Sequence, residues 1–469
     1  MMHKLISRRF RSSERGLARR SGPRNLTAAA AALALWFAPA ARALCPHELA
    51  LIVNTNNADS VEVAKAFAAA REIPQVNIVG VGLDPVKHVH VMSTGDFTRL
   101  VWDPVNAELA KRGIDGHIEA WIYSAGFPVG IATDPGMSIT GMTFTRNKVP
   151  PKDALNAGAA MSPLFAGPRE GSPDMLPSGG FERFKVGLRT KPPLPAMMLG
   201  VLGPKGNTVD EIVAMIRRGV ASDATHPEGI VWFVSVGDVR WTCREWQIAP
   251  VLKELKEKGV PARLANLVTP GKGATTGLFT GSARPDIKAV RTFAPGAIAD
   301  HLTSFAGFFQ ESAQIKLTEW IRQGATASSG TVVEPYAIWT KFPNARIFLH
   351  QRAGLSIIES YYLSVGSPLQ LIIVGEPLAS PFAPEISFSF DARMTPEGLA
   401  LSFFDVKGPK DLRFRVLADG RPVGRDRSDP EGWVIPRDAL PKGEGKITGI
   451  VMQDVPVRFS RQKTVVLRK

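Results

Sequence analysis

The sequence predicts an α/β body with a mostly parallel sheet and helices on both of its faces, followed by a small all-β domain of the sandwich type. From residue 45 to about residue 383, short apolar runs alternate with helical segments. The first run, Leu49 to Asn54, is continuously apolar, which is typical of a strand in a sheet that is covered on both faces. From Pro384 onward apolar and polar residues alternate, as in Ile386 to Phe390, and this pattern predicts exposed antiparallel strands. We therefore expect the α/β body to span residues 44–383 and the β domain to span residues 384–469.

The first repeating unit of the body reads as strand, helix, strand. After the strand at Leu49 to Asn54, Asp59 and Glu62 have the spacing of a helix capping box, and Pro74 ends the helix. The run from Val76 to Gly82 is the next expected strand. Such a unit predicts a parallel pair joined by a right-handed crossover.

The same pattern continues along the body. Thr208 and Glu211 form a second capping signal, and a later helix ends at Gly259 and Pro261. A Gly- and Pro-rich segment, about residues 128–195, interrupts the pattern, and we expect it to be an insertion that lies over the sheet. Further strands are expected at residues 118–123, 197–202, 229–235, 262–267, 297–299, 325–333 and 369–374, and further helices around residues 209–216, 252–255, 315–323 and 355–363.

The first 43 residues have the organisation of a signal peptide. Nine Lys and Arg residues stand against one acid, Glu14, and an apolar run from Leu26 to Phe37 leads to Ala41-Arg42-Ala43. We expect cleavage after Ala43 and export to the periplasm, the cell envelope or the exterior. A retained membrane anchor is the alternative, but an apolar run of roughly 12 to 15 residues is shorter than the roughly 20 that span a bilayer. After cleavage we expect a protein that is not integral to the membrane.

The charge of the chain is concentrated in this leader. The whole sequence carries a net charge of +14, and the first 43 residues supply +8 of it, since they hold nine basic residues and one acidic residue. A nucleic-acid-binding protein would instead combine a basic patch with a recognition element in its folded part. We therefore expect no nucleic-acid partner.

The two cysteines, Cys45 and Cys243, are expected to form a disulfide, because an exported protein folds in an oxidising compartment. The alternative is two separate buried thiols.

Several sequence motifs of enzymes are absent. The chain contains no Gly-x-Ser-x-Gly, no P-loop, no Gly-x-Gly-x-x-Gly and no His-Glu-x-x-His, which argues against a lipase, a nucleotide hydrolase, a dehydrogenase and a zinc protease. His88 and His90 could supply half of a metal site, but no third ligand is identifiable. We expect no cofactor and no metal.

The strongest candidate site lies where the expected strand 297–299 ends. Asp300 and His301 follow this strand, with Ser304 shortly after, and histidine is the side chain whose charge changes near neutral pH. In open α/β sheets, ligands bind at the carboxyl ends of the strands. The alternative is a structural histidine that is hydrogen-bonded to a loop and held by Asp300.

The next expected strand, 325–333, adds Ser328, Ser329 and Glu334 to the candidates. Only one helix separates the two strands, so we expect them to be neighbours or near neighbours in the sheet. The hypothesis is a pocket lined by His301, Ser304, Ser329 and Glu334 and roofed by residues 133–180. For the small residues of this strand, close packing is the alternative to ligand binding.

Four blocks of the body follow one another in a recognisable order. They are Leu51-Ile-Val-Asn-Thr-Asn56 with Ser60 and Arg71 to Asn77, Gly296 to Phe305, Gly324 to Tyr336, and Val374-Gly-Glu-Pro-Leu378 with Pro381-Phe382. Together they resemble an uncharacterised family of exported bacterial proteins from genomes that carry exosortase, a membrane enzyme proposed to sort C-terminally tagged proteins to the cell surface. The resemblance covers about residues 48–383 and excludes the β domain. The chain departs from the family at Glu376, where members usually have Asp.

A fainter resemblance links the order of the blocks to the gingipain and caspase type of cysteine peptidase, in which a histidine follows one strand and a cysteine ends the next. Here His301 is followed by Ser328 and Ser329, with no cysteine, so the resemblance implies an inactive cysteine protease.

Two hypotheses about function follow. The first is an exported cell-envelope protein with a noncatalytic binding or scaffold role, linked to exosortase-type sorting, whose partner is an envelope protein or polymer. The second is a peptidase-like hydrolase that uses His301.

Overall fold

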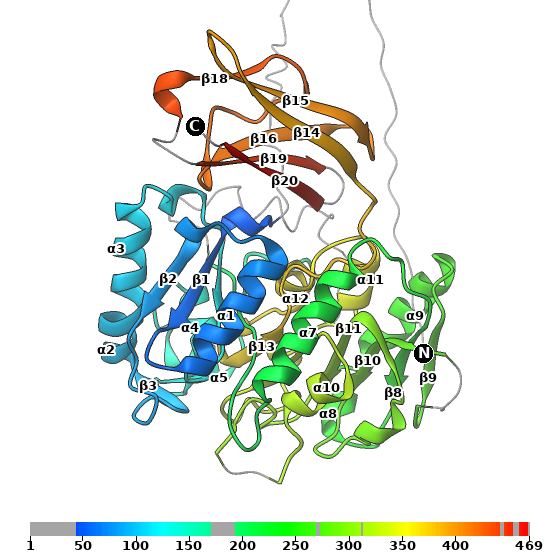
Figure 1. Cartoon of the computed structure of the whole chain (residues 1–469). Coiled ribbons are helices and arrows are strands. Elements are labelled where there is room, and N and C mark those ends of the chain that lie inside the picture. Colours follow the sequence, from blue (N-terminus) through cyan, green and yellow to red (C-terminus); the bar gives the residue numbers. More distant parts are fainter. Residues whose placement is uncertain are drawn as a thin grey trace, which may run out of the picture. The chain divides into compact units, whose positions relative to one another are not determined.

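The computed structural model describes residues 44–168, 170, 193–268, 273–310, 313–440, 445–453 and 459–467 (Figure 1). The predicted leader, with its cleavage point after residue 43, lies outside the described residues, as do residues 171–192 of the predicted insertion.

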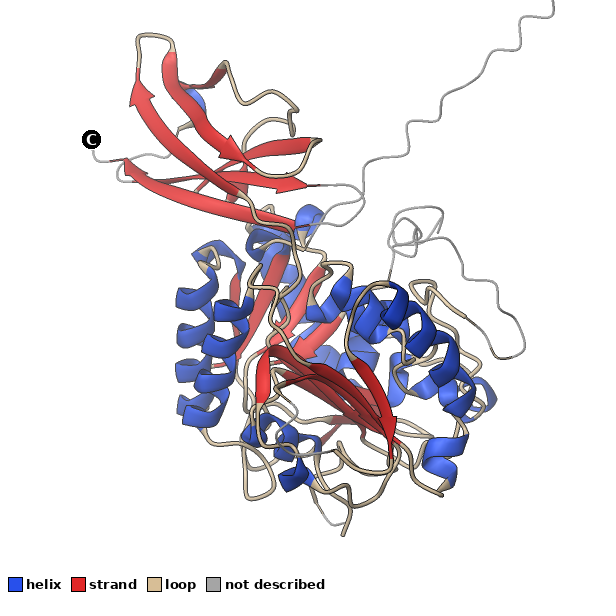
Figure 2. Cartoon of the chain, turned by 90° about the vertical axis from the view of Figure 1, so that its right-hand side faces the viewer, coloured by secondary structure: helices blue, strands red, loops and turns tan. Residues whose placement is uncertain are grey.

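The body is built on one large sheet of the order β2-β1-β4-β7-β13-β12-β11-β10-β8-β9. Neighbouring strands pair in parallel, except for β12 and β13, which are antiparallel. Helices cover both faces of the sheet (Figure 2), so the predicted fold class is confirmed. The strands are β1 (Leu49–Asn54), β2 (Ile78–Val81), β4 (Ala120–Tyr123), β7 (Ala196–Met198), β8 (Ile230–Val234), β9 (Ala262–Ala265), β10 (Thr275–Thr280), β11 (Phe293–His301), β12 (Ala327–Thr331) and β13 (Leu371–Gly375).

The helices follow the expected pattern with local differences. In α7 (Val209–Ser222) the capping box of Thr208 and Glu211 is formed as predicted. In α1 (Ala58–Arg71) the cap is Asn57, whose side chain accepts from the Ser60 amide, so the cap predicted at Asp59 is wrong by two positions. The other α-helices of the described residues are α2 (Thr94–Phe97), α3 (Asp103–Lys111), α4 (Ile139–Phe144), α5 (Lys152–Asn156), α8 (Val239–Thr242), α9 (Ile248–Glu257), α10 (Leu317–Gln323), α11 (Ile347–Arg352) and α12 (Ile357–Ser364).

The described part of the predicted insertion is structured and belongs to the core. It contains β5 (Gly130–Ala132) and β6 (Met137–Ser138), which form a separate small sheet with β3 (Val91–Ser93) in the order β3-β5-β6. All six residues of α4 are buried, and the Ser138 hydroxyl donates to the carbonyl of Leu371 on β13 at 2.8 Å. The expectation of an irregular segment lying over the sheet is therefore wrong for this part, because its apolar and hydroxyl side chains pack into the body.

The C-terminal part consists of two antiparallel sheets, as predicted. Phenylalanine and β-branched residues from both sheets share one hydrophobic core, which makes the pair a sandwich. One sheet has the order β14-β15-β18 and the other β17-β16-β19-β20. Their strands are β14 (Ser387–Met394), β15 (Gly398–Lys407), β16 (Leu412–Ala418), β17 (Arg421–Pro422), β18 (Trp433–Pro436), β19 (Gly445–Gln453) and β20 (Phe459–Leu467).

The β domain contacts the body through buried polar groups at the start of β1. Arg415 of β16 donates to Nε2 of His47 at 2.6 Å and to the Glu48 carboxylate at 3.0 Å. Burial lowers the pKa of His47 to about 3, so its imidazole is neutral and can accept this hydrogen bond.

Within the described part of the chain, no helix has the length and apolar character needed to cross a membrane.

Candidate functional site

The predicted site at the end of β11 is a buried ion pair. Nη1 of Arg244 donates to Oδ2 of Asp300 at 2.7 Å, and the Ser329 hydroxyl donates to Oδ1 at 3.3 Å. The side chains of Arg244 and Asp300 are each only 1% exposed. Burial raises the pKa of Asp300, while the Arg244 guanidinium acts in the opposite direction. The structure thus brings two predicted residues, Asp300 and Ser329, together, but around an arginine that was not predicted.

Arg244 is fixed from several directions. It donates to the carbonyl of Thr280 at the end of β10 at 2.8 Å and to the carbonyl of Pro343 at 3.0 Å. Its guanidinium lies 3.9 Å from the ring centroid of Phe279. These contacts join the ends of β10 and β11 to the loop before α11, so the arginine has a structural role here. Arg244 stands one position after Cys243, and nothing in its local sequence indicates burial.

His301 is also fully engaged by the protein. The indole Nε1 of Trp320 donates to Nδ1 of His301 at 2.8 Å, which leaves Nε2 as the donor to the carbonyl of Ile315 at 3.2 Å. Only 1% of the residue is exposed, and burial lowers its pKa to about 4. The imidazole is therefore neutral near pH 7 and has no nitrogen left for a ligand, which corresponds to the structural alternative for this histidine.

The remaining candidates do not converge with His301. Ser328 is buried within β12, and its hydroxyl has no hydrogen-bond partner among the described atoms. Ser304 is half-buried, and Glu334 is exposed and accepts from the Tyr336 amide of its own loop at 2.9 Å. None of the six candidates lines the cavities described below. The predicted pocket of His301, Ser304, Ser329 and Glu334 is therefore wrong.

The disulfide predicted between Cys45 and Cys243 is not formed. Cys45 precedes β1, and its buried thiol donates to the hydroxyl of Ser460 on β20 at 2.9 Å. Cys243 follows α8, beside the arginine that binds the carboxyl ends of β10 and β11. The two thiols therefore lie in different parts of the molecule.

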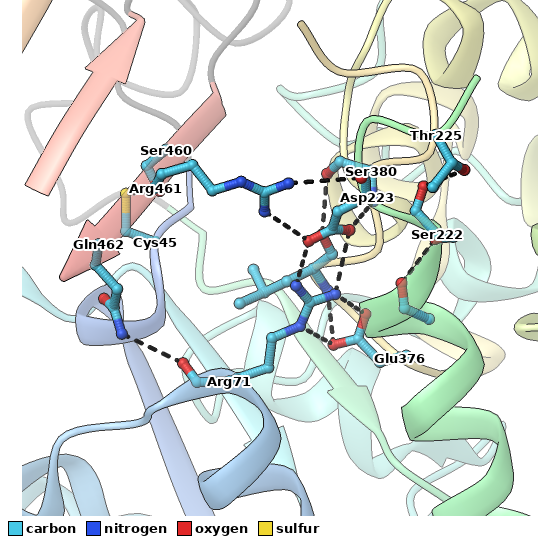
Figure 3. Close-up of polar contacts among 12 residues, drawn as sticks. Cys45, Arg71, Ser222, Asp223, Thr225, Glu376, Ser380, Ser460, Arg461 and Gln462 are labelled. Atoms are coloured by element: carbon cyan, nitrogen blue, oxygen red, sulfur yellow. Dashed lines mark hydrogen bonds and ion pairs between the residues drawn. The ribbon is translucent and has the colours of Figure 1, made fainter. Parts of the chain in front are cut away.

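Figure 3 shows a polar cluster that sequence reasoning missed. Arg71, the last residue of α1, donates to Asp223 just after α7 at 2.5 Å and to Glu376 just after β13 at 2.5 Å. From β20, Arg461 donates to the same Asp223 carboxylate at 3.2 Å. Asp223 therefore receives one arginine from the body and one from the β domain. Burial raises the pKa of Glu376, against the effect of the neighbouring Arg71.

Local sequence explains how the cluster forms. A Cβ at Gly219 of α7 would lie 2.6 Å from the Cβ of Glu376, so only glycine leaves room for this carboxylate. The amide of Ser380 donates to Oδ1 of Asp223 at 2.9 Å and holds the loop after β13 against the end of α7. The block Val374 to Leu378 is thus a structural element that carries a buried charge, which explains why a carboxylate occupies position 376.

A cavity of about 250 Å3 adjoins this cluster. Two arginines and three carboxylates line it, so the charged groups of the lining carry one excess negative charge. The lining residues are Leu44, Pro46, Ala69, Ala70, Arg71, Glu72, Val220, Asp223, Ser356, Glu359, Leu378, Ser380, Ser460, Arg461 and Gln462.

A larger cleft, of about 1080 Å3, opens between the end of α1 and the outer face of β16, β19 and β20. Arg112 on its wall donates to the carbonyls of Val76 and Ile78 at 2.7 Å, whereas Arg421 and Lys446 are exposed at its rim. The rest of its lining mixes apolar side chains with threonine, glutamine and carboxylate groups: Ala68, Ala69, Glu72, Ile73, Pro74, Gln75, Leu417, Asp419, Gly420, Gly445, Thr448, Gln462, Thr464 and Val466.

The described residues hold no group of three or more His, Cys, Asp and Glu side chains arranged to bind a metal. Nε2 of His88 lies 3.4 Å from the Asp96 carboxylate. Among the described residues, His88 and His90 are not part of a group of three possible metal ligands.

No protein-family model matches the chain, and no curated protein sequence matches it. Among solved structures, a chain titled "Structure of Protease" is similar, with a TM-score of 0.47 and 11% identity, over 89% of this chain and 97% of that one. The Clostridium perfringens spore cortex lytic enzyme SleM gives a TM-score of 0.20 and 14% identity, over 58% of this chain and 79% of that one. Because both TM-scores are below 0.5, neither similarity establishes a function for this chain.

Proposed function

We propose that this chain is an exported cell-envelope protein with a noncatalytic binding or scaffold role, linked to exosortase-type protein sorting. One observation carries the noncatalytic part of the proposal: both ring nitrogens of His301 are hydrogen-bonded within the protein, and Asp300 is bound to Arg244. A general base needs a nitrogen or oxygen within hydrogen-bond reach of its substrate. His301 could serve only after its contacts with Trp320 and Ile315 were broken. The link to sorting rests on the family resemblance of residues 48–383.

We place the binding surface in the cleft between the body and the β domain. Its volume of about 1080 Å3 is at the upper end of what small ligands fill, which favours a segment of an envelope protein or polymer. Exposed Arg421 and Lys446 offer charged donors at the rim, and the paired hydroxyls of Thr448 and Thr464, 2.9 Å apart, offer polar groups on the wall. Both the body and the β domain contribute to this surface.

The experiment compares cleft variants with a variant of the buried histidine. A deletion strain is complemented with wild type, with Arg421→Glu/Lys446→Glu, with His301→Gln, or with Lys253→Glu/Lys256→Glu as the matched charge reversal on exposed α9. The readout is the amount of a C-terminally tagged, exosortase-dependent protein at the cell surface, normalised to the amount of folded variant. We expect the cleft variant to lose sorting and the other two to retain it.

If the chain is instead a hydrolase, the same variants should give different results. Purified wild type would cleave peptide or polysaccharide substrates, and His301→Gln would abolish that cleavage while leaving the protein folded. This result would overturn the noncatalytic proposal. A cleft variant that sorts as well as wild type would overturn the location of the binding surface.

A further inference from the structure

Four neighbouring strands of the large sheet form a topological switch point. Their order is β9-β8-β10-β11, and each neighbouring pair is parallel (Figure 1). Along the chain, however, β8 is followed by β9 on one side of it and then by β10 on its other side. The direction of winding therefore reverses between β8 and β10. In open α/β sheets such a reversal leaves a crevice outside the carboxyl ends of the two strands, and ligands bind there.

The connections leave this part of the sheet on opposite faces. Helix α9, which joins β8 to β9, packs Val251 into the same core as Val231 of β8. The connection from β10 to β11 runs through a short 3-10 helix, η6 (Ile287–Ala289), and Val290 at its end shares a second core with Trp232 of β8. Successive residues of a strand point to opposite faces, so Val231 and Trp232 mark the two faces of β8. The two connections thus diverge at the carboxyl ends of β8 and β10.

A pocket of about 130 Å3 lies at this point. It is lined by Val234 and Thr280, the last residues of β8 and β10, and by residues of the loops that follow β8, β9 and β10. Its apolar part includes Val268, Leu278 and Trp320, which are 6%, 2% and 1% exposed. The pocket therefore combines the position expected for a ligand site with a buried apolar floor.

The size of the pocket limits what it can hold. An apolar cavity of about 150 Å3 is known to bind one benzene molecule, so this pocket has room for one ring or one branched aliphatic group. Sites for larger ligands have volumes of about 300 Å3 or more, which argues against a nucleotide or a flavin.

The polar groups of the described lining are mostly hydrogen-bond donors. Arg284 is exposed and carries five N–H donors, of which the described structure uses Nε, bound to the carbonyl of Ala313 at 3.2 Å. Ser282 accepts from the Arg284 amide at 3.2 Å, so its own hydroxyl proton can be donated, and the exposed Asn266 amide adds further donors. Asp286, in contrast, accepts at Oδ1 from two backbone amides of η6, which it caps. A ligand that accepts hydrogen bonds and carries negative charge fits these groups.

We propose that this pocket binds a small organic acid whose apolar group has about the size of one benzene ring. The apolar group lies against Val268, Leu278 and Trp320, and the carboxylate accepts from Arg284 and Ser282. Arginine suits this role because its planar guanidinium matches the geometry of a carboxylate. The site is separate from the proposed binding cleft, since none of these residues lines that cleft.

The experiment uses phenylacetate as the probe and ligand-observed NMR titration of the purified chain as the measurement. Phenethyl alcohol and phenethylammonium are the neutral and the cationic analogues. In Val236→Phe, a ring is added at a half-buried position of the lining, and Val239→Phe makes the same change at a 58% exposed position outside it. In Arg284→Gln the guanidinium is removed, and Arg291→Gln is the matched change at an exposed arginine outside the lining.

We expect wild type to bind phenylacetate at least about fivefold more tightly than either analogue, because hydrogen bonds to a charged group are the stronger ones. Arg284→Gln should remove this preference, and Arg291→Gln should keep it. Val236→Phe should weaken binding of phenylacetate by about tenfold or more, since the added ring takes up the space of the ligand's own ring, whereas Val239→Phe should bind as wild type does. Circular dichroism and Tm show whether each variant is folded, and Arg284→Gln still tests the site if Val236→Phe is not.

The proposal is overturned if phenylacetate does not bind wild type at millimolar concentrations. It is also overturned if folded Val236→Phe binds as tightly as wild type, or if Arg284→Gln keeps the preference for the carboxylate. None of these variants changes the cleft or His301, so failure here is distinguishable from failure of the proposed function.

Discussion

The buried pair of Arg244 and Asp300 gives the sharpest test of the structural role of the predicted site. Arg244→Met removes the charge but keeps an unbranched apolar chain beside Phe279. Asp300 would then keep only the 3.3 Å hydrogen bond from Ser329 at 1% exposure. Loss of one partner from a buried pair costs about 3–5 kcal/mol, and the carbonyls left without their donor are part of that cost. We expect the free energy of unfolding to fall by about 4 kcal/mol.

The double variant Arg244→Met/Asp300→Leu is the control, because it removes both charges and leaves apolar side chains. Replacing a whole buried pair with apolar groups is often nearly neutral, so we expect the double variant to recover at least half of the loss. Denaturant unfolding followed by circular dichroism measures the free energy of unfolding of the single and the double variant, provided that the m-value stays constant.

We also expect the stability of the Arg244→Met variant to depend on pH. Burial without the arginine raises the pKa of folded Asp300 above its unfolded value of about 3.9, so the folded state favours the protonated acid. The stability deficit is therefore smallest at acidic pH and grows as the pH rises through the folded pKa. The reasoning is refuted if Arg244→Met costs less than about 1 kcal/mol, or if single and double variants lose equal amounts.

Three further predictions test the same structure. His301→Ala should lower the free energy of unfolding by roughly 2–4 kcal/mol, because the Trp320 indole loses its acceptor. Burial lowers the pKa of folded His301 to about 4, so as the pH falls from 6.5 to 4 wild type should lose up to about 3 kcal/mol more than this variant, whereas buried His47 titrates in both proteins. Under denaturing, nonreducing conditions Ellman's reagent should find two thiols, whereas in the native protein Cys243 reacts slowly and Cys45 does not react; a count of zero would restore the disulfide. The connection at residues 376–383 is buried and accepts hydrogen bonds from residues 224 and 226, so it should resist limited proteolysis, and an early cut there would contradict this packing.

The sequence predicted the fold class because buried strands and capped helices have local signatures. Leu49 to Asn54 and the capping box at Thr208 are of this kind, and both lie as expected. The strand at residues 275–280 was not predicted, since Thr-Thr-Gly-Leu-Phe-Thr has neither a continuous apolar run nor strict alternation. The antiparallel pairing of β12 with β13 also has no local signal, because it depends on how the chain returns to the sheet after α12.

The candidate site was harder to predict because the sequence does not show which distant residues bind Asp300 and His301. Asp300 and His301 do end β11, but whether such groups face solvent depends on Arg244 and Trp320, which are 56 and 19 residues away. The polar cluster at Arg71 was missed for the same reason, since its partners follow α7, β13 and β20. Long-range ion pairs leave no periodic pattern in a sequence. A single signal was available, namely the position of Arg71 and Glu376 in two separate blocks of the family resemblance.

The position of the β domain bears on where function lies in this molecule. The polar groups at the carboxyl ends of β10 and β11 are hydrogen-bonded within the protein. The polar cavity and the larger cleft described above lie elsewhere, where β20 meets α1. Both parts of the chain line these two cavities, since Asp223 and Glu72 come from the body and Arg461 and Gln462 from the β domain. A binding role at this junction therefore requires the two parts to stay docked, and the buried contact of Arg415 with Glu48 supplies the anchor. The contacts that hold the β domain against the body would thus also keep the proposed binding surface assembled.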